Sequence, residues 1–147
     1  MIRKIIVAVA LVAALFLIGT VLYVRNSPPA IAAISDADAS SNKPYVVKIH
    51  AQWCPICMIT KRVWSDIEDA YSGRANLVVL DFTNQANSDM SQAEARRLGL
   101  QRVFEEYYGA TGTIVVVNGR TKDITAAIHG SRDFAEYRTA IDAVLNK

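Results

Sequence analysis

Four short segments of the chain alternate or cluster hydrophobic residues in a way that favours β-strands. They are rich in aliphatic and β-branched residues and are bounded by Pro, Gly or Asn: residues 45–51, 77–82, 113–117 and 123–128. Side chains alternate along a strand, so Val46, Lys48 and His50 share one face of the first segment and its other residues share the opposite face. Asn118-Gly119 predicts a two-residue hairpin turn between the last two strands.

Apolar residues at helical spacing separate these strands. Pro55 suits the first turn of a helix that runs to Tyr71 and ends at Ser72-Gly73. Residues 83–91 are polar and predict no element, after which Ser91-x-x-Glu94 resembles a capping box opening a helix through Leu98. Residues 103–108 extend that helix or form another, and an amphipathic helix spans 134–145. The order β-α-β-α-β-β-α predicts an α/β fold with a mixed sheet and helices on both faces.

The first residues have the pattern of a membrane anchor. Residues 5–24 carry no formal charge, and as a helix they would span about 30 Å, the thickness of a bilayer core. Arg3 and Lys4 precede this run, so residues 1–25 predict a single transmembrane helix with a cytoplasmic N-terminus. A cleaved signal peptide is the alternative, with small-x-small patterns at 30–32 and 37–39, although the apolar run exceeds the usual length. Residues 26–43, with Pro28 and Pro29, predict a flexible linker.

Composition narrows the class of function. The hydrophobic fraction of 52% is inflated by the N-terminus, and the net charge of +2 comes from 16 basic and 14 acidic residues without a long basic block. Nothing in this balance favours a nucleic-acid partner. The chain has two cysteines, both in Cys54-Pro55-Ile56-Cys57, and therefore no disulfide framework.

The two cysteines carry the chemistry that the sequence predicts. At the start of a helix, unsatisfied N–H groups favour the thiolate of Cys54, whose thiol is expected to face solvent and act as nucleophile. Cys57, one turn deeper, would resolve the mixed disulfide that Cys54 makes. A structural zinc site lacks ligands, because no second Cys pair and no His pair follow. A purely structural disulfide would stabilise little across a two-residue gap.

Several neighbours of the motif have a functional and a structural interpretation. His50 could tune the cysteines or shuttle a proton, or be a packed histidine, and His129 has a weaker claim. Cys54, Cys57 and His50 could hold copper, without support from Met58, the only nearby methionine. Trp53 could shield the disulfide and contact partners, or simply pack. Core packing is the default role for Tyr107 and Tyr108.

From residue 44 to 147 the chain resembles the thioredoxin superfamily. The likeness rests on Trp53-Cys54-x-x-Cys57 after a strand ending in Ala, the strand pair around Asn118-Gly119, and Gly130 after the last strand. It implies a thioredoxin fold and a membrane-tethered thiol–disulfide oxidoreductase in which Cys54 attacks and Cys57 resolves. Its partners would be proteins with disulfides or thiols and a membrane electron donor. It would sit in a bacterial inner membrane, facing the periplasm or an analogous space, without cofactor or metal.

Two positions depart from the family pattern. Members usually carry a cis-proline before the third strand, in a loop that faces the cysteines and binds substrate; here Thr111-Gly112 occupies that place. A cis bond without proline is costly, so we expect a trans bond, with Gly112 supplying an unusual backbone angle or a close approach. Lys48 replaces a buried acid, and it would favour the thiolate, act as a base, or lie on an exposed edge and reach water.

Overall fold

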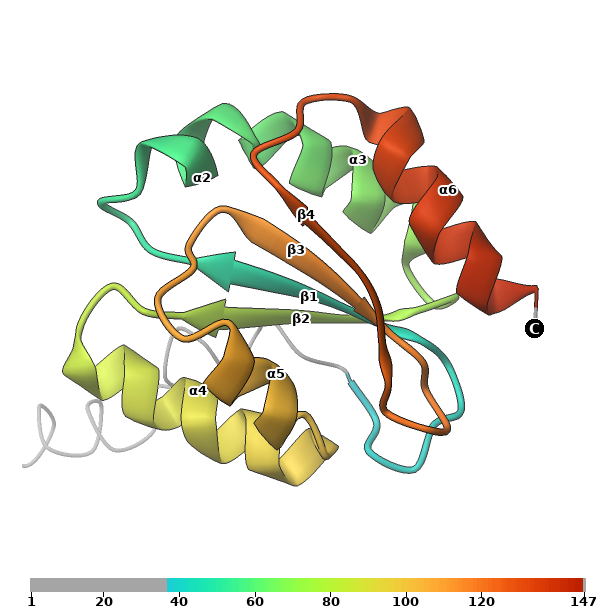
Figure 1. Cartoon of the computed structure of the whole chain (residues 1–147), viewed down its shortest axis with the longest axis horizontal. Helices are drawn as coiled ribbons and strands as arrows, with labels where there is room; N and C mark the ends of the chain where they lie inside the picture. Colours follow the sequence, from blue (N-terminus) through green and yellow to red (C-terminus); the bar gives the residue numbers. More distant parts are fainter. Residues whose placement is uncertain (1–36, 147) are drawn as a thin grey trace, which may run out of the picture. The chain divides into compact units, whose positions relative to one another are not determined.

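The computed structural model describes residues 37–146, and the predicted anchor (residues 1–25) lies outside this range. Within it, no helix is long and apolar enough to cross a membrane. The described chain forms a mixed α/β fold, which confirms the predicted class (Figure 1).

A four-stranded sheet lies at the centre of the fold, with the strand order β2-β1-β3-β4. Its members are β1 (Tyr45–His50), β2 (Asn76–Asp81), β3 (Thr113–Val117) and β4 (Ile124–His129). β1 pairs in parallel with β2 and antiparallel with β3, and β3 pairs antiparallel with β4. β1 therefore has a neighbour on each side, and the residues that follow it leave from the middle of the sheet.

Helices cover both faces of this sheet. On one side lie α3 (Lys61–Tyr71) and α6 (Phe134–Leu145), and on the other α4 (Gln85–Leu98) and α5 (Gln101–Glu106) (Figure 1). The short α2 (Pro55–Ile59) precedes α3, and Thr60 lies between them. The predicted single helix from Pro55 is thus divided at Thr60, whose hydroxyl donates to the carbonyl of Ile56 at 2.9 Å. A side chain bonded to a carbonyl one turn earlier competes with regular helix geometry.

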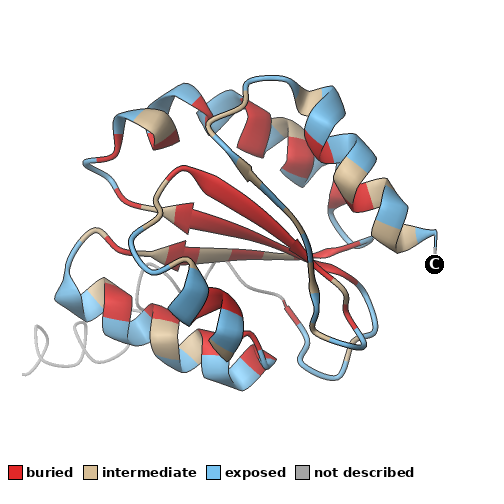
Figure 2. Ribbon diagram, in the orientation of Figure 1, coloured by how far each residue is buried: buried red, intermediate tan, exposed pale blue. Residues whose placement is uncertain are grey.

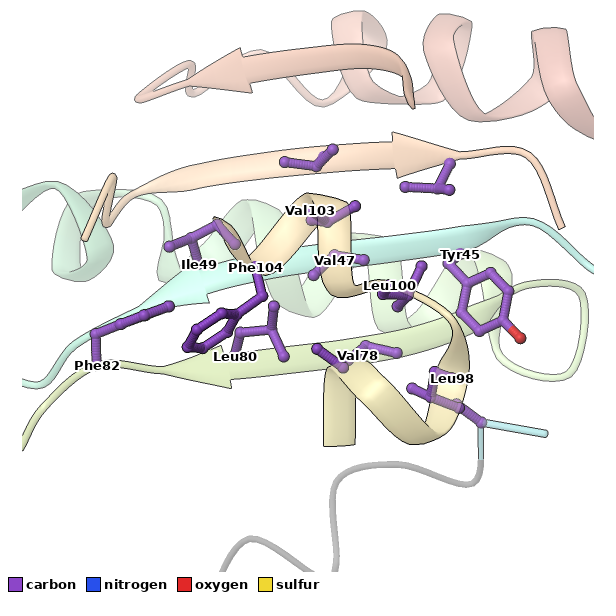
Figure 3. Packing of buried hydrophobic residues seen from close by; sticks show 14 residues of the cluster. Tyr45, Val47, Ile49, Val78, Leu80, Phe82, Leu98, Leu100, Val103 and Phe104 are labelled. Carbon is purple, nitrogen blue, oxygen red and sulfur yellow. The ribbon is translucent and has the colours of Figure 1, made fainter. Parts of the chain in front are cut away.

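The alternation predicted for the first strand produces two hydrophobic cores. Tyr45, Val47 and Ile49 pack toward α4 and α5, whereas Val46 packs toward α3 and α6. The buried positions concentrate on the sheet and on the inner helix faces (Figure 2). Figure 3 shows the first core, in which residues of β1 and β2 meet the ends of α4 and α5, among them Leu98, Leu100, Val103 and Phe104.

The start of α4 differs from the prediction. The helix begins at Gln85, in the stretch expected to lack structure, and Asn84 caps it by accepting a hydrogen bond from the Asn87 N–H at 2.9 Å. Ser91 is therefore no N-cap: it lies within the helix and is buried. Gly99, with φ of 71°, ends α4, so the following residues form a second helix, one of the two predicted alternatives.

The connection between β3 and β4 is also longer than predicted. The ladder pairs Val117 with Ile124 across an irregular register, so Asn118-Gly119 is not a two-residue hairpin turn. Instead the Asn118 side chain accepts hydrogen bonds from the N–H groups of Arg120 and Thr121 and so stabilises a turn within the connection. Gly119 serves a different purpose, because a Cβ there would collide with the carbonyl groups of Asn42 and Lys43.

Residues 37–43, the last part of the predicted linker, contact the domain; we call them the N-terminal segment. Ala37 is buried in the first core, and its carbonyl accepts a hydrogen bond from Arg97 at 3.1 Å. The Tyr45 hydroxyl donates to the carbonyl of Asp38 at 3.0 Å. Asn76 donates to the carbonyl of Lys43 at 3.1 Å. The segment is thereby attached where β1 and β2 begin.

Candidate functional site

The cysteine motif lies where β1 ends, at the left of Figure 1. The chain turns after Ala51, whose carbonyl accepts from the Cys54 N–H at 3.2 Å, and α2 begins with Pro55 in its first turn. Pro lacks an N–H that would be unsatisfied at this position, so it favours a helix start here. The loop before β3 reaches the same place, because the Gly112 N–H donates to the Ile49 carbonyl at 2.8 Å.

Cys54 and Cys57 lie close together with different environments. Cys54 caps α2: its Sγ accepts a hydrogen bond from the Cys57 N–H at 3.2 Å. Burial raises the pKa of Cys54, but hydrogen bonds from the Cys57 side chain, Thr111 and the backbone outweigh burial, and the pKa falls below its ordinary value. Burial and the neighbouring Cys54 raise the pKa of Cys57 to about 11. The first sulfur is thus prepared to be a thiolate and the second to stay protonated.

Neither sulfur is open to solvent, contrary to the expectation for Cys54. Each cysteine is only 3% exposed, and together with Ala51 they form a small buried cluster against which Ile56 packs. The Cys57 thiol donates to the Ile49 carbonyl at 3.8 Å, on the strand beneath it. Both cysteines are free thiols in this structure.

Trp53 is fixed in place although it is 61% exposed. Its indole Nε1 donates to the Thr83 carbonyl at 3.1 Å, and the Thr83 hydroxyl accepts from the Gln52 N–H at 2.9 Å. Thr83 in turn donates to the Asp81 carboxylate at the end of β2. Thr83 was not among the predicted site residues, because no local pattern pairs it with Gln52, 31 positions earlier. Met58, 66% exposed, lies on α2.

Gly112 combines both properties expected of it. All peptide bonds of the described chain are trans, and Gly112 has φ of 89°, a left-handed conformation that favours glycine. A Cβ at this position would lie 2.5 Å from Ile56 Cγ2 and 2.8 Å from Ile56 Cβ. Gly130 also lies against Ile56, and its N–H donates to the Gly112 carbonyl at 3.1 Å. The Ile56 side chain, between the two cysteines, therefore occupies space that the missing Cβ atoms of Gly112 and Gly130 leave open.

Lys48 is buried on the central strand, so the expected alternative of an exposed edge is wrong. Its Nζ lies 5.3 Å from the centre of the Trp64 ring on α3. Burial lowers the pKa of Lys48, whereas the nearby Cys57 and Glu68 act to raise it. Lys48 is therefore a desolvated cation within electrostatic reach of the second cysteine.

The histidines lie near the site in different settings. The Nδ1 atom of His50 is buried and has no hydrogen-bond partner among the described residues (37–146). Burial, followed by the charge of Lys48, lowers the pKa of His50. His129 Nδ1 lies 3.0 Å from the Thr113 hydroxyl, and its Cε1 lies 3.6 Å from a Cβ built on Gly112. Across residues 37–146, no three His, Cys, Asp or Glu side chains are placed to hold a metal ion, so Cys54, Cys57 and His50 do not form the copper trio considered above.

The two tyrosines before Gly112 differ in their packing and exposure. Tyr107 packs against the first core. Tyr108 is 59% exposed and meets Phe82 and Phe104 edge-on, with ring centres 5.1 and 5.6 Å away. Core packing accounts for the first and only partly for the second.

Comparison of the chain with protein-family models gives no match, and neither does comparison with curated proteins. The geometry of the site therefore carries the functional argument.

Proposed function

We propose that this domain has a thioredoxin-like fold and exchanges thiols and disulfides with other proteins through Cys54 and Cys57. The observation that carries the proposal is the division of roles between the sulfurs. Cys54 accepts the Cys57 N–H and has a lowered pKa, whereas the pKa of Cys57 is raised to about 11. A thiolate attacks disulfides and a thiol does not, so the pair has one nucleophile at rest and one held in reserve.

The reaction follows from this division. The Cys54 thiolate attacks one sulfur of a substrate disulfide, forming a mixed disulfide and releasing the other substrate sulfur as a thiolate. Cys57 then loses its proton to solvent and attacks Cys54 Sγ, which breaks the mixed disulfide and releases the second substrate thiolate. The substrate gains two electrons and the cysteine pair becomes a disulfide. Because Cys54 is 3% exposed, a substrate must displace neighbouring side chains to reach it.

The N-terminal pattern supports a location for this reaction. As proposed from residues 1–25, the chain is held in a membrane with its domain outside the cytoplasm. The bilayer would then separate the domain from cytoplasmic reductants. If the domain works as a reductant, its Cys54–Cys57 disulfide must be reduced again after each reaction. A dithiol donor in the membrane would do this by forming a mixed disulfide with Cys54 and returning two electrons.

Trapping tests the proposal with a matched pair of variants. Cys57→Ser in the full chain removes the resolving sulfur, so substrates should accumulate as mixed disulfides on Cys54 in cells. Cys54→Ser, with the same change of one sulfur to oxygen, should trap few or none. Gels run with and without reductant give the yield. Absence of trapped protein in the Cys57→Ser cells would contradict the proposal, and tight copper binding by the reduced protein would then favour metal delivery.

The Cys57→Ser protein also reports the protonation of Cys54. Iodoacetamide reacts with the thiolate, so its rate follows the ionised fraction of Cys54. The serine hydroxyl of this variant can still donate to Cys54, as can Thr111 and the backbone, so the rate should fall as pH drops through a midpoint below the ordinary 9.0. A midpoint at or above that value would remove the basis for assigning Cys54 as the nucleophile.

A further inference from the structure

We propose that Lys48, as an ammonium ion, stabilises the thiolate that Cys57 must form in order to resolve the mixed disulfide. This inference rests on the proposed exchange reaction and assigns its second step to a named charge. Lys48 would act through Cys57 and not on the substrate, and so it is a positioning residue.

Lys48 is the neighbour in β1 of the residue that the Cys57 thiol contacts. Cys57 donates its thiol to the carbonyl of Ile49, the residue that follows Lys48 in β1. The Lys48 side chain projects to the face of α3, which continues from α2 after Thr60, and its ammonium lies over Trp64. Lys48 and the acceptor of the Cys57 thiol are thus consecutive residues of one buried strand, and the charges of Lys48 and Cys57 act on each other.

The ammonium of Lys48 makes no hydrogen bond and no ion pair among residues 37–146, and its contact is with the Trp64 ring. The Glu68 carboxylate, which acts on Lys48 through space, is exposed and accepts the Trp64 indole N–H at 2.6 Å. A buried cation without a carboxylate in direct contact is costly, and a nearby thiolate would relieve part of that cost. The arrangement therefore favours negative charge on Cys57 whenever Cys57 is deprotonated.

Lys48 and Cys57 influence each other's pKa, and few other charged groups act on Lys48. Lys48 acts to lower the pKa of Cys57, and Cys57 acts to raise the pKa of Lys48. The charged or titratable groups that act on Lys48 are Cys57 of α2 and Glu68 and Lys61 of α3, and Lys48 itself acts on His50 of β1. Its cross-strand partners, Val79 and Ile114, are apolar.

The need for this charge arises in the second step. At rest, Cys54 raises the pKa of Cys57. Once Cys54 is joined to substrate it carries no charge, so that part of the opposition disappears. Burial still opposes the Cys57 thiolate, and Lys48 is the cation acting against burial. Cys57 gives its proton to solvent, attacks Cys54 Sγ, and the Cys54–substrate bond breaks.

The experiment separates the two steps in the full reduced chain. Dithiobis(nitrobenzoic acid), a coloured aromatic disulfide, should release one thiolate when Cys54 attacks and a second when Cys57 resolves. Lys48→Met keeps much of the side-chain length without the charge. We expect the second phase at neutral pH to slow by about three- to tenfold, tenfold in thiolate population corresponding to ~1.4 kcal/mol. The first phase should change much less.

Lys61→Met is the matched control, because it removes a cation that also acts on Lys48 but lies exposed on α3. Its second phase should keep the wild-type rate. The pH midpoint of the second phase should rise in Lys48→Met and stay unchanged in the control, a shift that a purely structural role of Lys48 would not produce. Equal rates and midpoints in folded Lys48→Met and wild type would overturn the inference.

A second measurement needs no change at Lys48. The side-chain resonances of Lys48, followed by NMR through a pH titration, should give a lower pKa in Cys57→Ser than in the wild type, because the acidic partner is gone. Identical titrations would overturn the inference even if Lys48→Met failed to fold. The outcome is separable from that of trapping: without trapped substrates the exchange proposal fails, whereas the charge coupling between Lys48 and Cys57 is decided here.

Discussion

Gly112 lets the loop before β3 pack closely against Ile56, which lies between the two cysteines. Its φ of 89° is a conformation that other residues rarely adopt, and its missing Cβ leaves the space that Ile56 fills. The sequence could predict that glycine was needed at this position. It could not predict Ile56 as the reason, because the two residues lie far apart in the chain and meet only when α2 and β3 are brought to one end of the sheet.

Gly112→Ala should therefore destabilise the fold and disturb the cysteine pair. The left-handed backbone and the overlap with Ile56 together should cost about 2–4 kcal/mol in the free energy of unfolding, measured by urea denaturation of the full chain. Gly109→Ala is the control: Gly109 has φ of 71° in the same loop, but a Cβ there meets nothing within 4 Å. It should cost roughly 1–2 kcal/mol. Equal losses in the two variants would show that the contact with Ile56 contributes nothing.

Among the elements, α4 differs most clearly from the prediction, both in where it begins and in what Ser91 does. Its first turns are polar, so hydrophobic spacing predicted no helix before Ser91. The structure starts the helix at Gln85 and buries Ser91 against β2. β2 is an edge strand, and the Ser91 hydroxyl both accepts from the Asp81 N–H at 2.7 Å and donates to the Asp81 carbonyl at 3.1 Å. The residue predicted as an N-cap is thus a buried hydroxyl that bonds the edge strand to the helix, and hydrophobic spacing does not detect such a contact.

Ser91→Ala should leave both of those backbone groups of Asp81 without that partner. We expect a loss of about 1–3 kcal/mol in the free energy of unfolding, because buried polar groups that lose a hydrogen bond are costly. Ser88→Ala is a matched control, since Ser88 is also buried on α4 but its hydroxyl makes no hydrogen bond within the described chain. That control should change stability by less than about 0.5 kcal/mol. A Ser91→Ala protein as stable as the control would contradict this account of the β2 edge.

At the scale of the whole molecule, the order of strands and helices along the chain was largely predictable, and several contacts between distant segments were not. Each of the four predicted strands corresponds to an observed strand within a few residues: 45–51, 77–82, 113–117 and 123–128. Their runs of β-branched residues are long and end at Pro, Gly or Asn, which makes them recognisable. The cysteine spacing identified the candidate pair. Other features depend on contacts between distant segments, which no local pattern encodes. These are the place of Lys48 on a central strand, the hydrogen bond between Thr83 and Trp53, and the attachment of residues 37–43.

The attachment of the N-terminal segment (residues 37–43) can be tested through Gly119. Gly119→Ala would place a Cβ against the carbonyl groups of Asn42 and Lys43, so the segment must move away. Hydrogen exchange should become faster at the Ser41 amide, which now donates to the Asp38 carbonyl at 3.1 Å, while amides of β1 and β2 keep their protection. Gly73→Ala, with nothing within 4 Å of its Cβ, is the control and should leave this exchange unchanged. Unaltered exchange in Gly119→Ala would show that the segment is not held there.

The N-terminal segment also determines how the domain responds to mechanical load. A pull on the chain ahead of Ala37 passes into Arg97 of α4, Asn76 of β2 and Tyr45, all where β1 and β2 begin. The cysteines follow the other end of β1, a six-residue strand with a length of about 20 Å. We expect such a pull to load these three attachment points first, ahead of the strand that leads to the sulfurs. A chain held by its N-terminus can thus be tugged by its surroundings while the spacing of its two thiols stays constant.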